Sequence, residues 1–116
     1  MNFRETLGRH LRAIETRDLE TLAATVGDPL ILIMADGKLK RSKAEFVEAH
    51  RGWFAMKNWT LSAKPVEIYE DGALGVAGLH LDYREDAKTS ESYLTLVFEN
   101  RGGEWLMVQD QNTPIQ

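Results

Sequence analysis

The stretch that decides the fold is residues 92–112, SYLTLVFENRGGEWLMVQDQN, which has the pattern of two long strands joined by a short turn. From Trp59 onward the sequence pattern has a period of two, which is typical of strands with one buried face. The two glycines provide the backbone freedom that a tight hairpin needs. The segment predicts an antiparallel hairpin with strands over about 91–99 and 104–112.

Pairing across this turn assigns side chains to the two faces of the sheet. With Arg101 and Gly102 at the turn, the predicted partners are Phe98 with Trp105, Leu96 with Met107, Leu94 with Gln109 and Ser92 with Gln111. These residues share one face with Leu79, Leu81 and Tyr83 of the preceding strand. In this register no Asp or Glu lies on that face, except what Glu70 adds from a neighbouring strand. A register one residue different would flip every assignment and make Asp110 a candidate catalytic acid.

The N-terminal half reads as helices. Phe3, Leu7, Leu11 and Ile14 fall on one stripe of a helix over about 2–16. Asp18 is placed as the N-cap of a short second helix that Gly27 closes. His10 lies near the edge of the first stripe, where we expect it to be solvated.

The middle of the chain predicts a strand pair and a third helix. The run Leu30 to Met34 is branched and continuous, which indicates a strand buried on both faces, and Asp36-Gly37 is a turn signal. Ser42 and Glu45 have the spacing of a capping box for a third helix. The apolar stripe of that helix is Phe46, Val47, His50, Trp53 and Phe54.

Two further strands, over about 58–70 and 73–84, complete the pattern, with a looser polar connection at 85–90. Helices come first and most strands later, which predicts the α+β class. We expect one domain over 1–116, formed by a cone-like, curved antiparallel sheet with the N-terminal helices packed on its concave face. The length suits a single domain.

Composition excludes several function classes. The chain has no cysteine, which removes disulfides, zinc-thiolate sites and cysteine nucleophiles, and its net charge of -4 argues against nucleic-acid binding. The longest apolar run, 30–35, is too short to cross a membrane, and the charged start lacks a signal-peptide core. We therefore expect a cytoplasmic protein. No cofactor motif is present, and His80 with Asp82 lacks the third ligand that a metal site needs.

Polar side chains gather at one end of the predicted concave face, remote from the Arg101 turn. Apolar walls with a few convergent polar groups are what a small-molecule site requires. We expect a small apolar or mixed-polarity ligand there, and the predicted ligand contacts are Tyr83, Gln109, Gln111, Trp53, Ser92 and Met107. The candidates for catalysis are His50, as a general base, and Asp110. A hydrogen-bonded core role for His50 is the alternative.

The order of elements, with Gly103-Glu104-Trp105 opening the last strand, resembles the SnoaL-like, nuclear transport factor 2-like superfamily. The segments 70–83 and 105–113 also resemble the association domain of calcium/calmodulin-dependent kinase II. That pattern implies pocket arginines where this chain has Leu79 and Leu96, and histidines where it has Gln109 and Gln111. The resemblance thus implies the fold but not an anionic ligand.

The opposite sheet face carries a mixture of apolar and polar residues, including His80, Tyr93, Thr95 and Val108. It is too apolar for open water along its whole length, so we expect a homodimer through this face. Two functions stay open. One is a small-molecule-binding domain, with weak isomerase, cyclase or hydrolase activity as an option. The other is a non-catalytic assembly module. The lack of a concave carboxylate favours binding or assembly over catalysis.

Overall fold

The computed structural model describes residues 1–116 and contains three helices and six strands. In chain order these are α1 Phe3–Glu15, α2 Leu19–Ala24, β1 Val26–Ile33, β2 Leu39–Lys40, α3 Lys43–Ala55, β3 Trp59–Asp71, β4 Leu74–Glu85, β5 Lys88–Arg101 and β6 Glu104–Pro114. No helix is long and apolar enough to cross a membrane.

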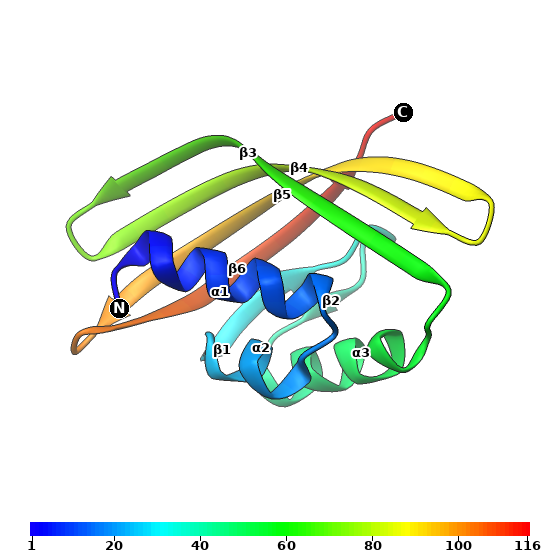
Figure 1. The fold of residues 1–116 in the computed structure, drawn as a ribbon. Coiled ribbons are helices and arrows are strands. Elements are labelled where there is room, and N and C mark those ends of the chain that lie inside the picture. The colour runs from blue at the N-terminus through cyan, green and yellow to red at the C-terminus, as the bar shows by residue number, and fades with distance from the viewer.

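The strands form one sheet in the order β2-β1-β6-β5-β4-β3. Figure 1 shows the sheet strongly curved, with the helices gathered on its concave side. The predicted α+β class and this arrangement of helices on a curved sheet are confirmed. One pair departs from the antiparallel expectation, because β1 runs parallel to β6. These two strands are joined by most of the chain, so no short turn dictates their relative direction.

Side-chain caps start each helix. Asn2 and Glu5 form a capping box at α1, and Asp18 accepts a hydrogen bond from the Thr21 amide at α2. At α3 the Ser42 hydroxyl accepts from the Glu45 amide at 3.2 Å, as its sequence pattern predicts. The sequence therefore specifies the helix starts locally.

Three predictions about these elements differ from the structure. Helix α2 ends at Ala24 with Thr25 as its C-cap, so Gly27 lies in β1 instead of closing the helix. Strand β1 is buried on one face only, since Leu32 is buried while Ile31 is 45% exposed. The expected loop at 85–90 is a two-residue turn, because pairing of β4 with β5 continues to Glu85 and Lys88.

The hairpin of β5 and β6 contains a β-bulge at Val108. Phe98 pairs with Met107 while Val97 pairs with Gln109, which leaves Val108 without a partner. The predicted pairing of these two strands was therefore wrong along its whole length. The turn itself is displaced, since Arg101 pairs with Glu104, and the bulge shifts the register by one further residue.

The core is densest near the β5–β6 turn, where α1 packs on the sheet. Phe3 is fully buried, and its ring centroid lies 5.5 Å from that of Phe98 and 5.4 Å from that of Trp105. Gly75 of β4 faces this cluster. A Cβ atom at Gly75 would lie 2.7 Å from carbons of the Phe3 ring. The close approach of α1 to the sheet thus depends on the missing side chain.

Strand β3 forms one edge of the sheet and carries a proline near its middle. Its pairing with β4 is irregular between Pro65 and Glu67, where Val66 has no partner. The opposite edge is the two-residue strand β2. Both edges of the sheet are therefore short or interrupted.

We predict that Gly75→Ala lowers the free energy of unfolding by about 1–3 kcal/mol, because the new methyl group overpacks the Phe3 cluster. Gly78→Ala on the same strand is the matched control, since its Cβ would meet only the Glu67 carbonyl oxygen at 3.7 Å. Urea unfolding of both variants measures the difference. Equal stabilities would contradict the proposed packing of α1.

Candidate functional site

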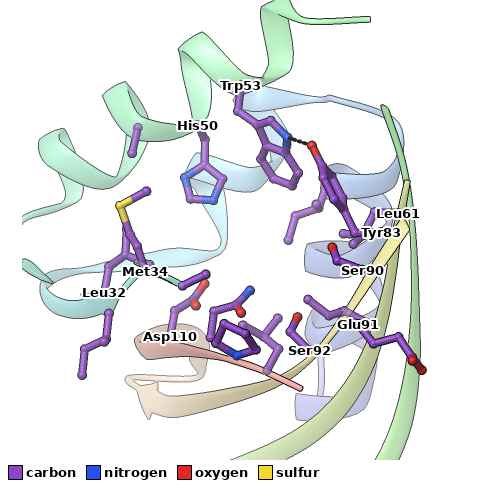
Figure 2. Close-up of a pocket in the computed structure, with 18 residues that line it drawn as sticks. Leu32, Met34, His50, Trp53, Leu61, Tyr83, Ser90, Glu91, Ser92 and Asp110 are labelled. Atoms are coloured by element: carbon purple, nitrogen blue, oxygen red, sulfur yellow. Dashed lines mark hydrogen bonds between the residues drawn. The ribbon is translucent and has the colours of Figure 1, made fainter. Parts of the chain in front are cut away.

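A cavity of about 420 Å³ lies between α3 and the concave face of the sheet, at the end away from the β5–β6 turn. Figure 2 shows His50 and Trp53 directed into it from α3, facing Asp110 and Ser92 on the sheet. Most of its lining is apolar. The lining residues are Ile14, Leu32, Ile33, Met34, Ala35, Ala49, His50, Trp53, Leu61, Leu81, Tyr83, Ser90, Glu91, Ser92, Leu94, Asp110, Asn112 and Pro114.

Asp110 is the buried acid of this cavity. Its side chain is on β6, directly after the bulge, and the residue is only 5% exposed. Burial raises the pKa of Asp110 from 3.8 to about 7, and no hydrogen bond from the protein counteracts this. Near neutral pH the carboxyl therefore exists in both protonation states, which suits a general acid or base.

His50 contributes a neutral imidazole from α3. Its Nδ1 lies 2.8 Å from the Phe46 carbonyl oxygen, which only accepts, so Nδ1 carries the proton and donates. Burial lowers the pKa of His50, and this hydrogen bond partly opposes the effect. The Nε2 atom is left as an acceptor. A ring stacked on Phe46, with centroids 4.0 Å apart, is held firmly in this orientation.

Tyr83 and Trp53 form a hydrogen-bonded wall. Trp53 Nε1 donates to the Tyr83 hydroxyl at 3.1 Å, and that hydroxyl donates to Glu85 at 2.8 Å. Burial is the main cause that raises the pKa of Tyr83. Its phenol thus finds its partners within the protein and presents mainly its ring to the cavity.

The Arg17 guanidinium packs against this wall on the side away from the cavity. Trp53 stacks on Trp59 with ring centroids 4.1 Å apart, and the Arg17 guanidinium carbon lies 3.9 Å from the Trp59 ring centroid. Arg17 also donates hydrogen bonds to the backbone carbonyls of Met56 and Trp59. Arg17 therefore stabilises this wall and does not itself line the cavity.

The predicted ligand contacts divide between three places. Tyr83, Trp53 and Ser92 line the cavity, whereas Met107 is fully buried in the core and does not line it. Gln109 and Gln111 belong to the opposite face, because the bulge at Val108 reverses the facing of the residues after it.

The catalytic candidates, by contrast, both line the cavity. The expectation that no strand carboxylate faces it was wrong, since Asp110 does so. Asn112, two residues further along β6, also lines the cavity and was missed for the same reason. The sequence has no local signal for the bulge, because residues 105–108 are all apolar and residues 109–112 are all polar, so the pattern does not show where a residue is skipped.

His10 is a further correction, because it is fully buried and not solvated. Its Nδ1 lies 2.7 Å from the Thr25 hydroxyl, and its Nε2 has no partner. Burial lowers the pKa of His10 to about 3, so the ring is neutral. It ties α1 to the end of α2.

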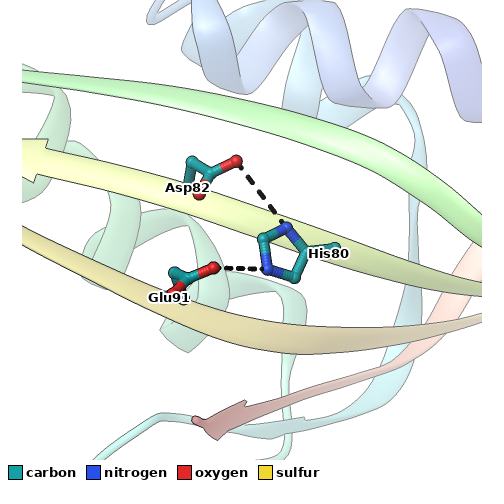
Figure 3. A group of neighbouring side chains, drawn as sticks. All are labelled: His80, Asp82 and Glu91. Atoms are coloured by element: carbon teal, nitrogen blue, oxygen red, sulfur yellow. Dashed lines mark hydrogen bonds and ion pairs between the residues drawn. The ribbon is translucent and has the colours of Figure 1, made fainter.

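The outer face carries a separate polar cluster of His80, Asp82 and Glu91 (Figure 3). His80 Nε2 lies 2.9 Å from a Glu91 oxygen, and Nδ1 lies 3.7 Å from an Asp82 oxygen. Glu91 is the third polar group of the cluster, and the sequence pattern does not predict it here. Since both ring nitrogens face carboxylates, the cluster has the geometry of a hydrogen-bonded imidazole between β4 and β5.

The family model of the SnoaL-like domain matches residues 4–114, which is nearly the whole chain. The chain belongs to the SnoaL-like domain family. No curated protein matches the sequence. Solved structures show how widely this fold is shared, and the resemblance that the sequence suggests is confirmed at the level of family and fold.

Among solved structures, a candidate calcium/calmodulin-dependent protein kinase type II association domain from Thiobacillus denitrificans has a TM-score of 0.87 at 17% identity, covering 99% of this chain and 96% of its own. An uncharacterised cystatin-like protein from Caulobacter vibrioides has a TM-score of 0.86 at 17% identity, with coverages of 97% and 87%. A candidate ketosteroid isomerase from Shewanella frigidimarina has a TM-score of 0.83 at 16% identity, covering 94% of this chain and 92% of its own. At these identities the similarity shows the SnoaL-like fold alone.

We predict that Asp110 lowers the stability of this SnoaL-like domain as the pH rises. Its pKa is higher in the folded state, about 7, than its ordinary 3.8. The folded state therefore binds more protons between these values, and the contribution of Asp110 to stability is lost as pH rises from about 4 to 7. The full difference corresponds to about 4 kcal/mol.

Asp110→Asn should remove this dependence and raise the free energy of unfolding at pH 8 relative to the unmodified chain. Urea unfolding at a series of pH values measures it, with Asp71→Asn, at an exposed hairpin position, as the control for loss of one charge. Parallel stability curves for Asp110→Asn and the unmodified chain would show that Asp110 is not desolvated.

Proposed function

We propose that this SnoaL-like domain binds a small, mainly apolar molecule in the cavity beneath α3, with Asp110 as the polar anchor. The observation that carries the proposal is the Asp110 carboxyl, which is buried, lines the cavity and receives no hydrogen bond from the protein. Burying an unpaired carboxyl is costly, and a ligand with a complementary group would offset that cost. A cavity of about 420 Å³ lies within the usual range for small molecules.

Proton transfer to or from the bound molecule is the chemistry that the lining supports best. Asp110 titrates near neutral pH, and His50 offers Nε2 as an acceptor from the opposite wall. Two such groups with different proton affinities suit acid–base catalysis of an isomerisation, cyclisation or hydrolysis. The structural neighbour named as a candidate ketosteroid isomerase adds support for the first of these.

A cavity-filling substitution tests the proposal. Ala49 lines the cavity from α3, so Ala49→Trp should fill it and abolish small-molecule binding. Ala44→Trp is the matched control, because Ala44 is exposed on the same helix and does not line the cavity. Saturation-transfer NMR with a mixed set of neutral, cationic and anionic aromatic fragments measures binding.

We expect fragments that bind the unmodified chain and the Ala44→Trp variant but not the Ala49→Trp variant. Circular dichroism and thermal unfolding establish that both variants fold. If no fragment binds the unmodified chain, or if the same fragments bind a folded Ala49→Trp variant equally well, the proposal fails.

Self-association through the outer sheet face is a second candidate function. A row of paired residues crosses this face from β1 to β3, and every member except the one on β6 is apolar. In order across the sheet the row is Ile31, Gln109, Val97, Val76 and Tyr69. Ile31 is 45% and Tyr69 63% exposed in the single chain. We propose that a second copy covers this face, and the neighbour named as a candidate association domain adds support.

We predict that Tyr93→Arg converts a dimer into a monomer. Tyr93 is 51% exposed on the same face, so the substitution places a charge in the interface without disturbing the core. Sedimentation equilibrium measures the mass against the 13.2 kDa chain. If the unmodified protein sediments as a monomer at about 100 μM, a concentration at which even a weak dimer would form, the assembly role is contradicted.

A further inference from the structure

The polar atoms that the cavity offers to a ligand are mainly hydrogen-bond acceptors. Asp110 presents carboxyl oxygens that no protein group pairs, and His50 presents Nε2 because its other nitrogen donates to Phe46. Asn112 lies two residues from Asp110 on the same strand face, and its Oδ1 is buried without a hydrogen-bond partner. Buried acceptors of this kind require donors.

The donors of the wall are already engaged within the protein. Trp53 Nε1 donates to Tyr83, and the Tyr83 hydroxyl donates to Glu85. The hydroxyls of Ser90 and Ser92 remain, which can donate or accept, together with the side-chain N–H groups of Asn112. A ligand that itself supplies several N–H groups therefore fits this lining better than one that supplies acceptors.

The charge distribution points the same way. No lysine or arginine lines the cavity. Glu91 belongs to the lining, but its carboxylate is turned away from the cavity (Figure 2) and lies 2.9 Å from His80 on the outer face. Asp110 is therefore the one charged side chain directed inward, and it has no counter-ion in the protein. A cation is the complement that this site lacks.

We propose that the ligand of this cavity is a small organic amine, bound as its ammonium ion. The N–H groups are directed at Asp110, with His50 Nε2 as a further acceptor, and the hydrocarbon body lies against Leu32, Met34 and Leu94. The ring of Trp53 offers the cation an additional favourable surface. This inference rests on the proposed small-molecule site and names its ligand class.

Other ligand classes fit less well. An anion would meet Asp110 in a cavity without any cationic side chain, which costs binding energy. A neutral carbonyl compound could accept a hydrogen bond from protonated Asp110, yet it would leave His50 Nε2 and Asn112 Oδ1 without donors. The amine alone satisfies both the charge and the hydrogen-bond requirements.

Matched series of ligands test this assignment. Amines with phenyl, cyclohexyl and naphthyl bodies, beginning with phenethylamine, are each compared with the alcohol and the carboxylate of the same body by isothermal titration calorimetry at pH 8. We expect the best amine to bind about tenfold or more tighter than its alcohol, since a charge-assisted hydrogen bond replaces a neutral one. The carboxylates should not bind measurably.

The pH dependence supplies a second readout. Between about pH 6 and pH 8 the affinity for the amine should rise about tenfold, because Asp110, with a pKa of about 7, becomes ionised. Burial lowers the pKa values of His50 and His10, which disfavours their charged forms, and Tyr83 has a raised pKa. Strands β1 and β3 contribute only uncharged side chains to the lining, so Asp110 alone changes charge there.

Asp110→Asn should remove both the preference for amines and the pH dependence, while Asp71→Asn, which loses an equal charge on the exposed β3–β4 hairpin, should keep both. Equal or tighter binding of the alcohols or carboxylates would overturn the amine assignment, as would failure of every amine to bind. If aromatic fragments bind the unmodified chain but not the Ala49→Trp variant, that failure concerns the ligand class alone. If no fragment binds the unmodified chain, the cavity itself is not a binding site.

Discussion

The β-bulge at Val108 is the constraint on which the functional character of this domain depends. Up to Met107, strand β6 contributes apolar side chains to the core, and after the bulge it places Asp110 on the same concave face. A continuous ladder would instead turn two glutamines inward and the carboxyl outward. The neighbouring strand accommodates the irregularity, since its own pairing with β6 shifts between Val26 and Ile31, where Gly27 lies close to Val108.

What could be foreseen from the sequence follows the range of the interactions concerned. Some features depend only on residues a few positions apart and can be recognised in a single sequence. These are the helix caps at Asp18 and Ser42 and the glycine turn at Gly102. The family resemblance and the α+β class follow from the order of these local elements. The bulge and the parallel alignment of β1 with β6 arise from contacts between distant segments, and they decide the site.

The two ends of the molecule differ in packing: one end is closely packed, and the other contains the cavity. Near the β5–β6 turn, α1 approaches the sheet so closely that only a glycine fits opposite Phe3, and the space is filled by aromatic rings. At the other end, Trp53 of α3 stacks on Trp59 of β3, and a cavity lies between α3 and the sheet. The closely packed end supplies the stability that a buried, unpaired carboxyl at the end with the cavity reduces.

The interrupted edge strand β3 has a consequence for how copies of this protein meet. A long, regular edge exposes a row of free amides and carbonyls, and other strands can extend the sheet by pairing with it, as in amyloid growth. In β3 the amide row is broken at Pro65 and the strand is bent at Val66, with Lys64 and Glu67 close by. Regular pairing of another strand along the whole of β3 is thereby disfavoured, and with it the open-ended edge-to-edge growth of a sheet from many copies.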